Sequence, residues 1–286
     1  MDWLTQLIET HKIPIGTWTA AFIDFLTINF AWFFDWLSLS LENSIEGLTA
    51  LLLFIPPLVL IALVTGFAYW LHRSGWMAAA IAVMLLFIIN LGFWEETIET
   101  LSLIVVATVL CMAAGVPIGI AAAHRPWLFT VLRPILDLMQ TLPPFVYLIP
   151  TMVLFSIGVV PGLISTVIFA IPAPIRLTHL GISSVPKQLI EAGESFGATK
   201  RQLLWKVELP HAMPTIMAGV TQAIMLSLSM VVIAALVGAD GLGKPVVRAL
   251  SQVKIEMGIE AGLAIVIVAV LLDRICKQPS QKTGGS

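Results

Sequence analysis

Seven long runs of apolar residues constrain this chain most, because each run is long enough to cross a lipid bilayer. A helix needs about 20 mostly apolar residues to span the hydrocarbon core. Hydrophobic residues make up 58% of the 286 residues, and charged residues only 11%, where soluble domains carry about 25%. The runs cover residues 48–71, 76–94, 98–123, 134–156, 159–182, 212–238 and 258–275. The sequence therefore predicts an all-α, polytopic membrane helix bundle of about seven transmembrane helices.

The charge balance and the cysteine count exclude several other classes of protein. The chain has 15 Lys and Arg against 17 Asp and Glu, a net charge of −2, so it offers no basic surface to nucleic acid. Its 2 cysteines, Cys111 and Cys276, cannot form a disulfide framework or a thiolate metal cluster. The 5 histidines show no metal-ligand spacing, and no serine has the G-x-S-x-G context of a nucleophile. We predict no catalytic site and no metal site.

The N-terminal segment differs from the seven runs. It carries Asp2 and Glu9 and lacks the basic start of a secretory signal. Residues 19–41 are apolar and rich in Phe and Trp, but they contain Asp24 and Asp35. We predict an amphipathic helix lying in the membrane interface, and an eighth span is the alternative.

The distribution of basic residues predicts the orientation, because short cytoplasmic loops carry an excess of Lys and Arg. When the polar stretch 183–211 is placed in the cytoplasm, 11 basic residues lie inside and 4 outside, which accounts for all 15. The opposite orientation would leave 11 outside. The sequence thus predicts an extracytoplasmic segment over 1–47, a transmembrane domain over 48–275 and a cytoplasmic tail over 276–286.

The stretch 183–211 predicts two short helices. Ser184 is placed to cap the first, Lys187–Ser195, whose first turn begins at Pro186. Gly197 permits a turn that a side chain would resist.

The second helix is signalled by Thr199 and Gln202, which match a capping box. It would run through Leu203, Leu204 and Val207 and end at Leu209–Pro210. Such a helix–turn–helix can dock into a groove on a soluble partner, and an ordinary solvated loop is the alternative.

The spacing within this stretch resembles the EAA signature of ABC importer permeases, written E-A-A-x3-G-x9-I-x-L-P. The matching residues are Glu191, Ala192, Gly193, Gly197, Val207, Leu209 and Pro210. Gly193 stands for the second Ala and Val207 for Ile. The resemblance implies that the stretch is a coupling helix that sits in a cleft of an ATP-hydrolysing subunit, with Glu191 facing a polar or basic partner. We call residues 183–211 the coupling segment.

Further segments resemble the glycine betaine/proline betaine/choline subfamily of type I importers. They cover residues 134–147, 229–235 and 259–266. The resemblance implies the permease subunit of an ATP-driven importer of a quaternary ammonium solute in a bacterial inner membrane. Its expected partners are two copies of an ATPase subunit, which would hold ATP and Mg, a second permease chain, and membrane lipid. Because the chain ends about ten residues after the last run, the extracytoplasmic substrate-binding protein is expected to be a separate polypeptide. The permease itself would be no enzyme and need no cofactor.

The substrate path is less clearly marked. A quaternary ammonium favours aromatic faces, and residues with suitable side chains occur in the fourth and sixth runs. These candidates are Phe145, Tyr147, Phe155, Met225 and Met230, with helix packing as the alternative. Glu95, Glu96 and Glu99 gather at the predicted outer mouth, as a solvated loop or as an attraction for a cationic substrate or for basic residues of a binding protein.

Three other motifs have simple interpretations. Residues 238–245 fit the G-x4-G-K pattern, but a proline follows instead of the Ser or Thr of a phosphate loop, so we interpret them as a Gly-rich extracytoplasmic turn. Asp137 lies four residues after Arg133 near the predicted inner end of a span, and we expect it either to snorkel to the interface or to pair with Arg133. Gly115 and Gly119 predict close helix packing.

Two other functions would require different sequence signals. An ion-gradient-driven secondary transporter of similar solutes is the main alternative, and it predicts repeated halves and mid-membrane polar sites. A membrane enzyme would need a convergent set of catalytic groups. Neither signal is present in the sequence.

Overall fold

The computed structural model describes residues 14–276, except for the side chain of Ile15, and every regular element in that range is a helix. The predicted N-terminal segment and tail fall partly outside the described residues, at 1–13 and 277–286. The helices are α2 (Ile15–Asn29), α3 (Ala31–Phe54), α4 (Pro57–His72), α5 (Gly75–Leu91), α6 (Trp94–His124), α7 (Pro126–Thr141), α8 (Pro144–Phe155), α9 (Val159–Ala170), α10 (Pro172–Ser183), α11 (Lys187–Ser195), α12 (Lys200–Leu203), the π-helix η1 (Leu204–Glu208), α13 (Leu209–Ala235), α14 (Gly243–Gln252) and α15 (Ile255–Cys276). The all-α fold class is confirmed.

Several of these helices are long and apolar enough to cross a membrane. Within the described residues there are 5, namely Ala31–Phe54, Trp94–His124, Val159–Ser183, Lys200–Ala235 and Ile255–Cys276. The pair α7 and α8 also qualifies if its two bent halves count as one span, and α4 and α5 are shorter apolar helices. The chain is therefore a polytopic bundle, although its helix boundaries differ from those of the seven runs.

Proline pairs divide two of the predicted runs. The run 48–71 breaks at Pro56, so that residues 48–54 belong to α3. The run 134–156 bends by 96° between α7 and α8, where Pro143 is the N-cap of α8. A proline disfavours helical backbone in the residue before it and lacks an N–H to donate. These two runs are therefore not single straight helices.

The N-terminal aromatic stretch also differs from its prediction. Residues 19–41 do not form one helix, because the chain breaks at Phe30 between α2 and α3. α3 continues to Phe54 and qualifies as a span by length and composition. This part of the chain therefore fits the alternative of a further span, whereas α2 remains a separate helix with exposed aromatic side chains such as Trp18 and Phe22.

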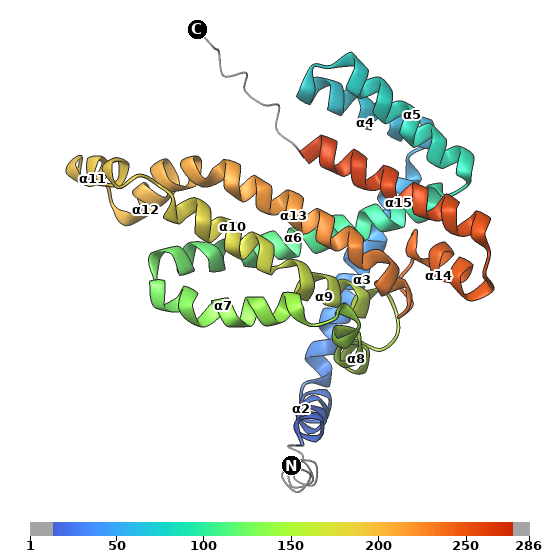
Figure 1. Cartoon of the computed structure of the whole chain (residues 1–286), viewed down its shortest axis with the longest axis horizontal. Helices are drawn as coiled ribbons and strands as arrows, with labels where there is room; N and C mark the ends of the chain where they lie inside the picture. The colour runs from blue at the N-terminus through green and yellow to red at the C-terminus, as the bar shows by residue number, and fades with distance from the viewer. Residues whose placement is uncertain (1–13, 277–286) are drawn as a thin grey trace, which may run out of the picture.

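The centre of the bundle is a close-packed unit of α6, α10 and α13, which run side by side in Figure 1. Small residues make this approach possible. A Cβ placed on Gly119 of α6 would lie 2.6 Å from the Cβ of Thr178 on α10, and one on Gly181 of α10 would lie 3.0 Å from the Cβ of Ala212 on α13. A Cβ on Gly115 would likewise meet α10 at 3.0 Å. The predicted close packing at Gly115 and Gly119 is confirmed.

The remaining helices lie at the two ends of the bundle. The hairpin of α4 and α5 packs through residues such as Ile81 and Leu85 against Ile267 and Leu271 of α15. α11 and α12 project at one end of the molecule, and α14 lies at the other (Figure 1). α15 starts beside α14 and runs back toward the end that carries α11.

Candidate coupling segment and translocation path

The first half of the coupling segment folds largely as its sequence predicts. α11 has the predicted bounds, Lys187–Ser195. Gly197 makes the following turn with φ +75°, a conformation that favours glycine. The predicted cap at Ser184 is wrong, because Pro186 occupies the N-cap and Ser184 Oγ donates instead to the carbonyl of Gly181 at 2.9 Å.

The capping box of the second helix is confirmed in both directions. Thr199 N donates to Gln202 Oε1 at 2.8 Å, and Gln202 N donates to Thr199 Oγ1 at 3.4 Å. Two otherwise unpaired amides at the start of α12 are satisfied in this way. The two side chains of the capping box were therefore sufficient to predict where this helix begins.

The predicted end of the second helix at Leu209–Pro210 is wrong. The chain continues through Pro210 as one long helix, Lys200–Ala235. The π-turn η1 makes this possible, since Leu209 N donates to the carbonyl of Leu204, five residues back. Pro210 lies in the first turn of α13, where its missing N–H is absorbed by this irregular turn.

Gly193 brings the two halves of the coupling segment together. A Cβ at this position would lie 2.5 Å from Leu203 Cδ2 and 3.9 Å from Val207 Cγ2. Leu203 is buried and Val207 is half-buried, so these two side chains form the small core of the segment. Gly193 and Val207 of the signature are thus internal packing residues.

The outer face of the coupling segment is polar with three large apolar side chains on it. Glu191, Ala192 and Gly197 are exposed. The exposed apolar side chains are Leu189 (45%), Phe196 (94%) and Trp205 (63%). Sequence reasoning missed these three residues. The available signal was a phenylalanine directly before the glycine of a polar turn, where nothing in the segment could cover it.

The five predicted path residues differ in exposure and surroundings. Phe145 and Met225 are partly exposed, at 55% and 37%, whereas Met230 is completely buried in α13. Phe155 packs edge-to-face on Phe34 of α3, with ring centroids 5.4 Å apart. These surroundings suit Phe155 and Met230 to helix packing.

Tyr147 has a defined structural contact. Its hydroxyl donates to the carbonyl of Met139 at 2.7 Å, which ties α8 back to the end of α7 across the 96° bend. Its role in a translocation path stays a prediction, as do those of the other four residues.

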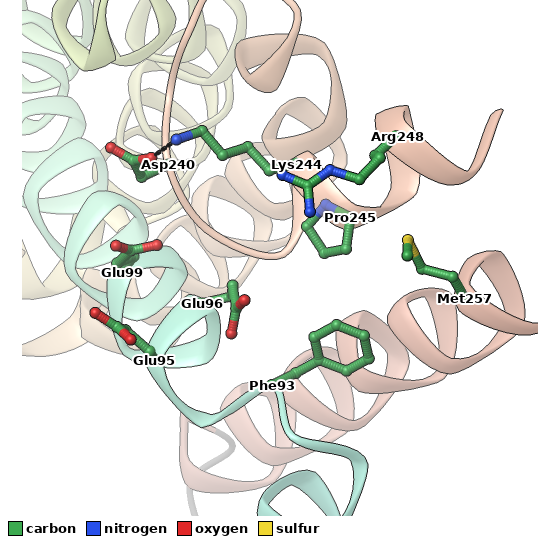
Figure 2. Close-up of a pocket in the computed structure, with 9 residues that line it drawn as sticks. All are labelled: Phe93, Glu95, Glu96, Glu99, Asp240, Lys244, Pro245, Arg248 and Met257. Carbon is green, nitrogen blue, oxygen red and sulfur yellow. Dashed lines mark hydrogen bonds and ion pairs between the residues drawn. The ribbon is translucent and has the colours of Figure 1, made fainter. Parts of the chain in front are cut away.

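A charged pocket lies at the α14 end of the molecule (Figure 2). Its volume is about 240 Å³. Glu95, Glu96 and Glu99 line one side, from the first turns of α6, and Lys244 and Arg248 of α14 line another. The predicted acidic cluster therefore exists, but basic side chains of the same chain face into the same pocket.

The Gly-rich loop before α14 packs on α6. Gly241 has φ +110°, and a Cβ there would lie 2.5 Å from Thr100 Oγ1. The next amide, Leu242 N, donates to Thr100 Oγ1 at 2.8 Å. Because this amide is occupied within the fold, the structure agrees with a turn and not with a phosphate loop.

The ion pair expected for Asp137 has a different partner. Asp137 Oδ1 accepts from Arg176 Nη2 on α10 at 2.6 Å, so the predicted pairing with Arg133 is wrong. The contact between α7 and α10 decides this, since it brings the two groups together from 39 positions apart. Within residues 14–276, no group of three or more His, Cys, Asp and Glu side chains is placed to hold a metal ion.

Known proteins with similar sequences are transport permeases. The chain is 47% identical over 264 residues to the glycine betaine transport system permease protein OpuAB of Bacillus subtilis, covering 92% of this chain and 93% of that protein. It is 42% identical over 287 residues to the glycine betaine/proline betaine transport system permease protein ProW of Escherichia coli, covering 96% and 81%. The glycine betaine/carnitine transport permease protein GbuB of Listeria monocytogenes is 42% identical, covering 94% and 96%.

A solved structure and a family profile agree with these relatives. A chain of the MetNI methionine ABC transporter, in an inward-facing conformation, superposes with a TM-score of 0.55 at 24% identity, covering 60% of this chain and 87% of that one. This likeness shows the fold. The profile of the family described as "Binding-protein-dependent transport system inner membrane component" matches residues 115–276, which include the whole coupling segment. The chain belongs to this family of ABC importer permeases.

Proposed function

We propose that this chain is the permease subunit of an ATP-driven importer of a quaternary ammonium solute such as glycine betaine, and that the coupling segment docks on a separate ATPase subunit. The observation that carries the proposal is the coupling segment itself. It projects from one end of the bundle (Figure 1) and presents three exposed apolar side chains on a polar surface.

These side chains favour docking over an ordinary solvated loop. Burying a side chain such as that of Phe196 contributes about 1.5–3 kcal/mol, and large exposed apolar groups at a polar site mark interaction surfaces. The internal packing of Gly193 on Leu203 holds α11 against α12, so the segment is preorganised to bind as a unit. A preformed helix–turn–helix loses little conformational entropy on docking.

The orientation follows from the distribution of charge on the two ends. The coupling segment would lie in the cytoplasm together with the end of α15, and the acidic pocket at α14 would face outward. Two such chains would form a two-fold dimer, with an ATPase subunit below each and a separate substrate-binding protein above. ATP and Mg²⁺ would be held by the ATPase subunits.

In this assembly, closure of the two ATPase subunits on ATP would move both coupling segments and rock the helices outward. Hydrolysis would reset the path inward. The choice of a quaternary ammonium solute rests on the relatives, whose names include glycine betaine, proline betaine and carnitine. Most of the specificity would lie in the binding protein.

The test is ATP hydrolysis and solute uptake by the reconstituted complex. The chain is co-expressed with a candidate ATPase subunit, inserted in lipid vesicles, and given a purified binding protein with glycine betaine, proline betaine, carnitine or choline in turn. We expect ATP-dependent uptake only with the binding protein and a quaternary ammonium solute. Uptake by this chain alone, driven by an ion gradient, would favour the secondary transporter instead.

A further inference from the structure

One contact between a carboxylate and an imidazole joins the base of the coupling segment to helix α6. Glu208 is the last residue of η1 and His124 is the last residue of α6. Glu208 Oε2 lies 2.9 Å from His124 Nε2, although the two residues are 84 positions apart. The Glu208 side chain is 9% exposed and that of His124 is 46% exposed. The carboxylate therefore lies inside the fold, and the imidazole closes it off from solvent.

Because Glu208 is buried, its carboxylate does not serve to keep the protein surface soluble. A carboxylate removed from water is unfavourable unless it is paired. The EAA pattern leaves this position open, so the signature itself asks for no acid here. An apolar residue at this site would bury without that penalty, and the acid is therefore best explained by its partner on α6.

The helix is irregular at the very place where Glu208 is held. The π-turn Leu204–Glu208 precedes Pro210, and a proline at 210 has no N–H to donate to the carbonyl of Lys206. π-turns inside helices occur frequently at functional sites. A push on α11 and α12 could therefore be absorbed in this turn before it reaches α13.

Helix α6, which contains Pro117 but is otherwise continuous, offers a second route that bypasses the π-turn. Its 31 residues span about 46 Å at 1.5 Å per residue, from His124 to the charged pocket that contains Glu95 and Glu99 (Figure 2). At that outer end, Thr100 holds the loop that follows α13 through its bond from Leu242 N. α6 and α13 are thus joined at both ends, and α10 is packed between them.

We propose that His124 and Glu208 are a positioning pair that transmits displacement of the coupling segment to α6, so that α6, α10 and α13 move as one body. This inference rests on the proposed function. When the ATPase displaces the coupling segment, the pair transmits this displacement directly to α6 and bypasses the π-turn. Helix α6 extends to the charged pocket at the other end of the molecule. It contacts no substrate, and its loss uncouples ATP hydrolysis from transport without removing either activity's own site.

The test measures the number of solute molecules imported per ATP hydrolysed in reconstituted vesicles. The variants are His124→Ala, Glu208→Gln and the exchanged pair His124→Glu/Glu208→His. We expect both single variants to assemble with the ATPase and to hydrolyse ATP. The number of solute molecules that they import per ATP should fall by at least about fivefold. The exchanged pair should restore at least part of the ratio. H124A leaves the buried carboxylate of Glu208 without its partner, whereas E208Q leaves no buried charge, so E208Q is expected to fold even if H124A is poorly tolerated.

The matched control is Asp137→Asn, which breaks the Arg176 ion pair between α7 and α10. It removes a charged contact of similar length away from the coupling segment, and its import ratio should equal that of the unaltered chain. An unchanged ratio in both H124A and E208Q would overturn the positioning role, as would an equal loss in the control. Absence of ATP-driven uptake by the unaltered complex would instead overturn the proposed function.

Discussion

Phe196 offers the sharpest test of the docking surface. Its side chain is 94% exposed, so Phe196→Ala removes almost no packing within this chain, and the free energy of unfolding should change by less than about 0.5 kcal/mol. If docking buries the ring, the variant forfeits about 1.5–3 kcal/mol of apolar burial. At 1.4 kcal/mol per factor of ten, the permease would bind each ATPase subunit roughly 10- to 150-fold more weakly.

The assay is a titration of purified ATPase subunit onto the permease in lipid nanodiscs, read as a dissociation constant. Leu250→Ala is the matched control, because Leu250 is also an exposed apolar residue, at 79%, but it lies on α14 at the opposite end. We expect L250A to bind as the unaltered chain does. Equal affinity of F196A and the unaltered chain would refute the reasoning that the exposed ring is an anchor.

Three further predictions concern glycines and a cap. Gly119→Ala should lower the thermal unfolding midpoint of the purified chain, because its Cβ would lie 2.6 Å from the Cβ of Thr178, and overpacking costs about 1–3 kcal/mol. Gly262→Ala, where nothing lies within 4 Å, should not lower it. Gly197→Ala should cost about 1 kcal/mol at φ +75° and weaken ATPase binding through a displaced turn, measured by the same titration. Thr199→Ala removes the capping box, which should destabilise α12 by about 1 kcal/mol and so raise its amide hydrogen-exchange rate by about fivefold. An unchanged exchange rate would contradict the role of the cap.

Short-range sequence patterns were sufficient to predict the structure of the coupling segment up to the start of its second helix. The bounds of α11 and the reciprocal bonds of Thr199 and Gln202 depend on neighbours within a few residues, so the sequence contains all that is needed to predict them. Ser184 does not cap α11 because the helix begins at Lys187 with Pro186 at its N-cap, two residues after the serine.

The end of the second helix shows why a proline alone is ambiguous. Pro56 and Pro143 break or bend their runs, whereas the helix passes through Pro210 by way of a π-turn. The difference lies in what packs on the helix. Val207 and Leu203 are held by α11, and Glu208 is held by His124, so tertiary contacts keep the chain helical across a residue that would otherwise end it.

The sequence by itself determined that this chain is a membrane helix bundle and predicted the two short helices within 183–211, because hydropathy and short-range spacing are properties of neighbouring residues. The tertiary structure alone decided which distant groups meet. It paired Asp137 with Arg176 and Glu208 with His124, buried Met230, and set the acidic residues of α6 opposite Lys244. These contacts join residues far apart in the sequence, and glycines such as Gly119 and Gly181 let α6, α10 and α13 approach closely at the centre of the bundle.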